Sequence, residues 1–149
     1  MKIPLFKVFM SEEAINESAK VLRSGYIGQG EVVDKFETIL KGYFKYPYIV
    51  TLNSGTSALH LSLHLLKEAH GDWWGLHDID HVMASPLTCT ATNWPILLND
   101  VGLKWVDISE KDLNMDLGEL GRRMTYNSKV IMLPYWGGYP SDLSKLEEL

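Results

Sequence analysis

The stretch YIVTLNSGTSALHL, residues 48–61, decides the fold class. Its first part, Tyr48–Leu52, consists of apolar, aromatic and β-branched residues and predicts a short strand. Asn53–Ser57 is polar and contains a glycine, which is typical of a turn. A leucine-rich helix is predicted to follow over Ala58–Ala69. A strand that leads directly into a helix is the repeating unit of α/β proteins.

The same turn predicts an anion site. The first N–H groups of a helix have no partner inside the helix, and the helix dipole favours negative charge at that end. Gly55 lets a ligand approach the backbone closely, and the hydroxyls of Thr56 and Ser57 offer further hydrogen bonds. From these residues alone, a phosphate site and an ordinary capped turn both remain open.

The rest of the chain extends the α/β pattern. Residues 1–46 predict a helical N-terminal arm, with helices over Glu12–Arg23 and Glu31–Phe44. Residues 47–149 predict β/α units, with further strands over His81–Ser85, Lys104–Ile108 and Val130–Leu133 and helices that start at Asn93, Asp116 and Ser141. The helix from Asn93 is expected to have Pro95 in its first turn and to end at Gly102, and residues 70–80 are expected to form a loop. We therefore expect an α/β fold with a mainly parallel sheet and flanking helices, and no complete second domain.

Composition excludes several classes of protein. The formal net charge is −5, and no stripe of Lys and Arg is present, so a nucleic acid is not an expected partner. No apolar run approaches the ~20 residues that cross a bilayer, so no membrane is expected either. Cys89 is the only cysteine, which excludes an internal disulfide and suits the reducing cytoplasm.

Two groups of histidines invite a metal interpretation. His77 and His81 flank two aspartates, but a solvated loop that leads into a strand explains them more simply. His60 and His64 are four residues apart on a predicted helix, which is a better geometry, but no third ligand is evident. We expect no metal site.

Four segments carry a resemblance to a known family. They are SGYIGQG at 24–30, NSGTSALHL at 53–61, ASPLTCTATN at 84–93 and YWGGYPSDL at 135–143. In this order they resemble the N-terminal part of the DegT/DnrJ/EryC1/StrS aminotransferases. The resemblance implies part of the large domain of the fold type I pyridoxal-phosphate enzymes. It also implies amino transfer, usually from glutamate, to a keto-sugar attached to a nucleotide.

The resemblance implies roles for individual residues. Gly55, Thr56 and Ser57 fall where the family binds the phosphate of pyridoxal 5'-phosphate. Cys89 falls where many members place an aromatic ring against the pyridine, and Tyr135 stands where a histidine is common. Tyr26, Gly28 and Gln29 lie in the loop that borders the substrate site of the family.

The resemblance also implies that no catalytic residue lies in this chain. The family's aspartate at the pyridine nitrogen and its catalytic lysine come in later segments, and no lysine here has a matching context. We expect a truncated member that is inactive alone. Since strand Tyr48–Leu52 would lack neighbours, we expect a homo-oligomer or a complementing C-terminal half. The alternatives are a non-catalytic module that binds a phosphate or nucleotide-sugar, or another protein, and a stable structural remnant with no ligand.

Overall fold

The computed structural model describes residues 3, 7–68 and 75–149. The chain forms two compact units, Met1–Thr51 and Leu52–Leu149. None of the helices in the described ranges is long and apolar enough to cross a membrane. The predicted loop over residues 70–80 lies partly outside the described residues.

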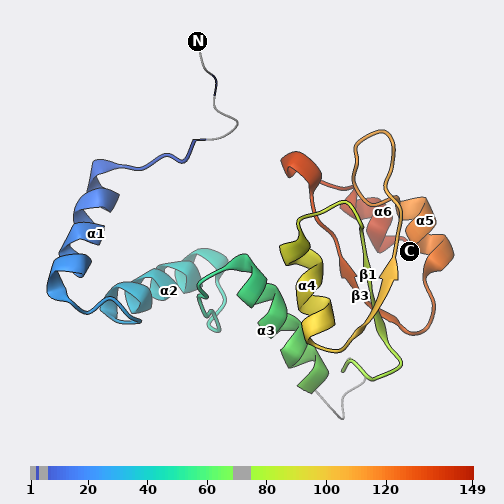
Figure 1. Cartoon of the computed structure of the whole chain (residues 1–149), viewed down its shortest axis with the longest axis horizontal. Coiled ribbons are helices and arrows are strands. Elements are labelled where there is room, and N and C mark those ends of the chain that lie inside the picture. Colours follow the sequence, from blue (N-terminus) through green and yellow to red (C-terminus); the bar gives the residue numbers. More distant parts are fainter. Residues whose placement is uncertain (1–2, 4–6, 69–74) are drawn as a thin grey trace. The chain divides into compact units, whose positions relative to one another are not determined.

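The first unit consists of two helices and confirms both predictions for this part of the chain. Helix α1 spans Glu12–Ser24, and the Ser11 hydroxyl caps it by accepting from the N–H of Ala14 at 3.2 Å. Gly25 ends α1 with a left-handed φ of 77°, which suits a residue without a Cβ. Helix α2 spans Glu31–Phe44 (Figure 1). Neither helix buries a residue.

The strand predicted over Tyr48–Leu52 does not form. These residues are irregular, and a side chain replaces the expected strand partner. The N–H and the hydroxyl of Thr51 both donate to the Glu37 carboxylate, at 2.8 and 2.9 Å. These donors lower the pKa of Glu37, with the backbone N–H as the larger cause. The prediction was wrong because apolar character alone does not supply the neighbouring strand that a backbone must pair with.

The second unit contains a parallel sheet, as predicted. Strands β1 (His81–Ala84), β2 (Gly102–Trp105) and β3 (Ser128–Met132) lie in the order β2-β1-β3. Both pairings are parallel, and Ala84 at the end of β1 is opposite Trp105 and Met132. The carboxyl ends of the strands therefore lie together at one edge of the sheet (Figure 1).

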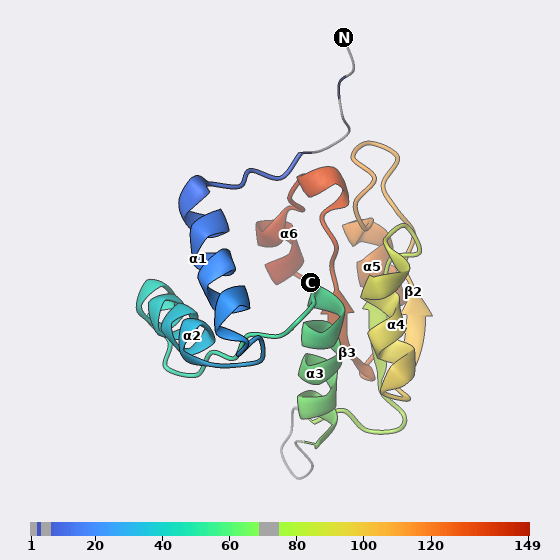
Figure 2. The same cartoon turned by 60° about the vertical axis from the view of Figure 1, so that its left-hand side comes forward.

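Helices cover both faces of this sheet. They are α3 (Gly55–Glu68), α4 (Thr90–Leu98), α5 (Leu117–Arg123) and α6 (Leu143–Glu147). Val82 and Ala84 join one core cluster with Leu63 of α3 and Ile96 of α4. Met83 points to the other face. There it joins a second cluster that contains Leu117 and Leu120 of α5 and is contacted by Leu146 of α6. Figure 2 shows α3 and α4 running in the same direction.

Helix α4 differs from its prediction. Asn93 was expected to cap it, with Pro95 in its first turn, but Cys89 is the N-cap and Pro95 lies inside the helix. The early start is tolerated because the proline removes only one backbone bond, and both Pro95 and Ile96 are buried. The helix ends at Leu98 with Asn99 as its C-cap. Gly102, expected to end it, begins β2 instead.

Candidate functional site

The start of α3 carries free backbone donors. The helix begins at Gly55, three residues before the predicted start at Ala58. Ser54 caps it: its hydroxyl accepts from the N–H of Ser57 at 3.1 Å, and its C=O accepts from Ala58 at 3.1 Å. Among the residues that the structure describes, the N–H groups of Gly55 and Thr56 have no acceptor. A Cβ placed on Gly55 would meet no atom within 4 Å, so the space beside these donors is open.

A pocket of about 440 Å³ adjoins this helix start. It is lined by Thr56, Ser57, His60, Leu61, His64 and Leu98. Thr56 and Ser57 therefore both line one pocket. His60 and His64 also line this pocket, although the sequence suggested them only as metal ligands. They follow Thr56 by one and two helical turns, and this i, i+4 spacing was the signal that could have placed them beside the turn. No Lys or Arg lines this pocket.

The histidines do not form a metal centre with other ligands. Within the described ranges, no three His, Cys, Asp or Glu side chains gather closely enough to hold a metal ion. Near β1, the Asp80 carboxylate instead accepts from the backbone N–H of His77 at 2.9 Å and is 3% exposed, which closes the turn before the strand.

The other predicted cofactor residue lies at the carboxyl edge of the sheet. Cys89 is an exposed free thiol at the N-cap of α4, in the connection that leaves β1. Cys89 does not line the pocket beside Thr56. In the order β2-β1-β3, the connections from β1 and to β3 lead to opposite sides of β1, so a topological switch point lies between β1 and β3. Ligands of open α/β sheets bind at such points.

The predicted substrate residues lie in the first unit. Tyr26, Gly28 and Gln29 are all exposed in the loop between α1 and α2. Tyr26 is 88% exposed, and its N–H donates to the Ser24 hydroxyl at 3.2 Å. The left-handed glycine of this loop is Gly25, not Gly28.

One residue near the carboxyl edge was missed by sequence reasoning. Asn114 is 3% exposed, and its side-chain amide reaches the turn that follows β3. Its Oδ1 accepts from the N–H of Trp136 at 3.0 Å, and its Nδ2 donates to the C=O of Tyr139 at 3.1 Å. This turn contains a short 3₁₀ helix, η1 (Trp136–Gly138), directly after the predicted residue Tyr135. Nothing in the spacing of the sequence indicates this contact.

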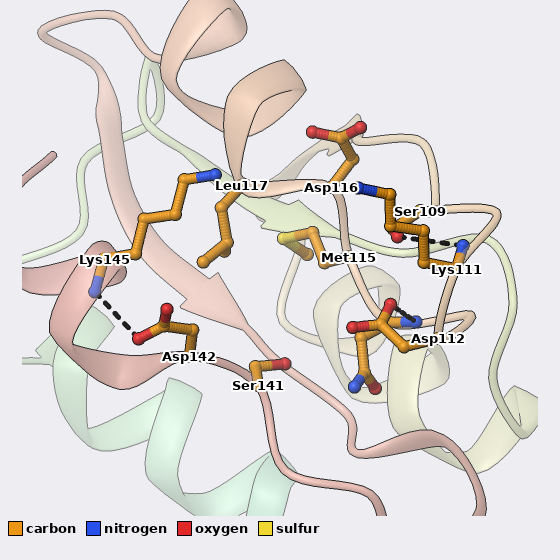
Figure 3. Close-up of a pocket in the computed structure, with 10 residues that line it drawn as sticks. Ser109, Lys111, Asp112, Met115, Asp116, Leu117, Ser141, Asp142 and Lys145 are labelled. Atoms are coloured by element: carbon orange, nitrogen blue, oxygen red, sulfur yellow. Dashed lines mark hydrogen bonds between the residues drawn. The ribbon is translucent and has the colours of Figure 1, made fainter.

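A second, polar pocket of about 290 Å³ lies where the loop before α5 approaches the start of α6 (Figure 3). Its lining residues are Ser109, Lys111, Asp112, Asn114, Met115, Asp116, Leu117, Ser141, Asp142 and Lys145. The Asp116 carboxylate caps α5 by accepting from the backbone N–H of Glu119 at 2.9 Å. The Asp142 carboxylate caps α6 by accepting from the backbone N–H of Lys145 at 3.1 Å. These carboxylates therefore serve helix starts, and they do not form an acid/base pair.

The carboxyl groups whose pKa is lowered lie outside both pockets. They belong to Glu13, Glu17, Glu37 and Glu119. For Glu119, hydrogen bonds from Arg123 and then from Arg122 lower the pKa. None of these groups lines either pocket, so they support structure and do not mark a reactive centre.

Comparisons with known proteins identify chains of similar sequence and fold. The chain is 35% identical to the sugar aminotransferase CalS13 of Micromonospora echinospora, with a TM-score of 0.82, over 99% of this chain and 38% of that one. It is 30% identical to the PLP-form of a sugar aminotransferase of Streptococcus pneumoniae, also with a TM-score of 0.82, over 99% of this chain and 36% of that one.

A curated relative gives a similar match. The dTDP-4-dehydro-2,3,6-trideoxy-D-glucose 4-aminotransferase of Saccharopolyspora spinosa is 26% identical over 148 residues, which are 98% of this chain and 36% of the relative. The chain thus spans 36% to 38% of the length of these three proteins. The family profile covers nearly all of it, from residue 9 to residue 149. The chain therefore belongs to the DegT/DnrJ/EryC1/StrS aminotransferase family.

Proposed function

We propose that this chain supplies the phosphate-binding corner and part of the ring site for pyridoxal 5'-phosphate in amino transfer to a nucleotide-linked keto-sugar. The observation that carries the proposal is the open start of α3. There, the N–H groups of Gly55 and Thr56 have no acceptor among the described residues, the space at the Cβ position of Gly55 is open, and Thr56 and Ser57 line a pocket. The names of the relatives, a sugar aminotransferase in its PLP-form and a nucleotide-sugar aminotransferase, support the same cofactor and substrate class.

The residues present fit the phosphate of this cofactor. Backbone N–H groups at a helix start, together with the positive end of the dipole, favour a phosphate without a basic side chain. Thr56 is half-buried, and its hydroxyl has no hydrogen-bond partner among the described residues. The Ser57 hydroxyl accepts from the Ser54 hydroxyl at 3.0 Å, so its own O–H remains available to donate to a ligand.

We place the pyridine ring of the cofactor at the carboxyl edge of the sheet. Cys89 and Tyr135 follow β1 and β3 and flank the switch point between them. When bound, pyridoxal phosphate acts as an electron sink for the carbon atom that loses or gains a proton. We assign Tyr26, Gly28 and Gln29 to the binding of the sugar substrate, since their exposed loop has no packing role of its own.

We further propose that these 149 residues bind the cofactor without catalysing amino transfer. The support is that the relatives are much longer: the chain spans little more than a third of each. The resemblance implies that a catalytic lysine shuttles the proton on the reacting carbon. In both pockets only Lys111 and Lys145 carry an amine, and they line the polar pocket away from Thr56.

A pair of ligands tests the phosphate corner. The chain is titrated by calorimetry with pyridoxal phosphate and with pyridoxal, which has the same aldehyde and ring but no phosphate. We expect pyridoxal phosphate to bind at least about tenfold more tightly, which corresponds to about 1.4 kcal/mol. The double variant Thr56→Val, Ser57→Ala is expected to lose most of this difference. Ser62→Ala is the control, because its hydroxyl bonds to Ala58 within the same helix, at 2.8 Å.

Equal affinity of the unchanged chain for pyridoxal phosphate and for pyridoxal would refute the proposed phosphate site at the start of α3. Binding of inorganic phosphate or a nucleotide-sugar, but not of pyridoxal phosphate, would favour the non-catalytic module instead. Amino transfer by the purified chain, followed as keto-acid release from glutamate, would refute the proposed lack of activity.

We also propose that the chain functions in association, either as a homo-oligomer or with a complementing C-terminal polypeptide. The support is the large apolar surface of α2, where Phe36, Ile39 and Tyr43 are each at least half exposed. Such patches mark interaction sites. Light scattering at micromolar concentration is expected to give a mass above that of the monomer. A monodisperse monomer, unchanged when the remaining part of a full-length relative is added, would contradict this.

A further inference from the structure

The turn that follows β3 is held at both ends by one buried side chain. Asn114 bonds to the N–H of Trp136 and to the C=O of Tyr139, the two residues that bracket the glycines of this turn. The acceptor and the donor of a single amide are both used. A rotation of this side chain would break both bonds, so it holds the turn in one position.

Asn114 is itself held firmly. Its C=O accepts from the N–H of Ser109 at 2.8 Å, and its own N–H donates to Asp112 at 3.2 Å. The next residue, Met115, is 2% exposed in the core and pairs with Ile108 in an antiparallel bridge. The backbone of Asn114 is therefore fixed beside Met115, which packs in the core cluster with Met83 of β1.

Without the two bonds from Asn114, the turn has little to define its position. Gly137 and Gly138 have left-handed φ values of 63° and 84°, and Trp136 and Tyr139 are 41% and 62% exposed. The backbone bonds of the turn in the described structure are local: Gly138 to Tyr135 at 3.1 Å and Tyr139 to Trp136 at 3.2 Å. Among the described residues, Asn114 makes the only hydrogen bonds that tie residues 136–139 to a distant segment of the chain.

This turn lies at the switch point of the sheet. Ala84 and Met132 are paired across β1 and β3. Tyr135 and Trp136 come three and four residues after Met132, and Cys89 comes five residues after Ala84. Figures 1 and 2 show the turn after β3 and the start of α4 at the same end of the sheet.

We propose that Asn114 is a positioning residue of the cofactor site. It places Tyr135 and Trp136 where their aromatic faces form a wall for the planar ring of pyridoxal phosphate, at a place where the thiol of Cys89 offers little stacking surface. This inference rests on the proposed function. It concerns the ring, whereas the corner at Thr56 concerns the phosphate, so the two can be tested separately.

The test compares the unchanged chain with four variants: Asn114→Ala, Trp136→Ala, the double variant with both of these changes, and Asn99→Ala. Asn99 is the matched control, because it is a buried asparagine (6% exposed) whose amide bonds two backbone carbonyls in α3 and α4 and not the turn. Two quantities are measured. One is hydrogen exchange of the Trp136 amide by NMR with labelled tryptophan, and the other is the dissociation constants of pyridoxal phosphate and of pyridoxal.

We expect Asn114→Ala to speed exchange of the Trp136 amide and to raise both dissociation constants by about tenfold. Both ligands are affected because they share the ring. The double variant is expected to bind no more weakly than Trp136→Ala alone, since residues that act through one another are non-additive. Asn99→Ala is expected to leave the exchange of the Trp136 amide and the dissociation constant of pyridoxal, which lacks the phosphate, unchanged.

Unchanged binding of both ligands by Asn114→Ala or by Trp136→Ala would overturn this inference while the phosphate corner still stands. Trp136→Ala decides the question even if Asn114→Ala does not fold, because Trp136 is a partly exposed residue of a turn. If the unchanged chain does not distinguish the two ligands, the phosphate corner falls alone. If it binds neither, both proposals fall.

Discussion

The contact between α3 and α4 gives the sharpest stability prediction. Asn99 is 6% exposed at the C-cap of α4. Its Nδ2 donates to the C=O of His60 in α3 at 3.2 Å and to the C=O of Pro95 in α4 at 2.8 Å. Its own C=O accepts from Lys67 at 2.8 Å, an interaction that a change of side chain leaves in place. Asn99→Ala removes the two side-chain bonds and nothing else of comparable size.

The expected loss follows from these two bonds. Each contributes about 1 kcal/mol net, and a buried carbonyl left without its donor adds up to about 1 kcal/mol. The free energy of unfolding should therefore fall by about 2 to 3 kcal/mol. With a urea dependence of about 2 kcal/mol per molar for a chain of this size, the midpoint should move down by about 1 M.

Urea unfolding followed by far-UV circular dichroism measures this change. Asn127→Ala is the matched control, because that half-buried side chain makes no hydrogen bond within the described structure. The control should move the midpoint by much less. If Asn99→Ala and Asn127→Ala have equal effects, the amide of Asn99 does not hold α3 and α4 together, and the reasoning fails.

Three further predictions address other parts of the chain. Because Thr51 lowers the pKa of Glu37 in the folded state, the bonds between them should persist at neutral pH and weaken as the pH falls through the acid range of this carboxyl; exchange protection of the Thr51 amide should show this loss, and Glu37→Gln should remove its pH dependence. Gly102→Ala should destabilise by about 1 to 3 kcal/mol, because the new Cβ would lie 2.9 Å from the C=O of Asp80, which is backbone and cannot move aside cheaply; thermal unfolding that matches the unchanged chain would contradict it. Cys89, an exposed thiol, should react with a thiol reagent at nearly the same rate in native buffer and in urea, and strong protection in native buffer would show that it is covered.

Local chemistry predicted the helices of the first unit well. Ser11 and Gly25 mark the ends of α1 as cap residues, and α2 has the predicted bounds, since the apolar spacing and the cap residues act within a few residues of one another. The alternation of strands and helices also predicted a parallel sheet, which is confirmed.

Sequence patterns were least reliable where a distant partner decides the structure. Tyr48–Leu52 has the composition of a strand, yet Glu37, fourteen residues before Thr51, takes the hydrogen bonds that a neighbouring strand would have supplied. In α4, Pro95 suggested a late helix start, but burial of Pro95 and Ile96 against the sheet outweighs the lost backbone bond.

The sequence by itself predicted the helices of the first unit and a parallel sheet in the second, and it singled out Thr56 and Ser57 beside Gly55 as a corner suited to an anion, but it wrongly predicted a strand over Tyr48–Leu52. Only the tertiary structure decided the order β2-β1-β3, and hence the switch point beside Cys89 and Tyr135. It alone joined Asn114 to Trp136 and Tyr139 across more than twenty residues. The physical reason is range: caps, turns and periodicity act between near neighbours, whereas strand order and buried hydrogen bonds depend on which distant segments the core brings together.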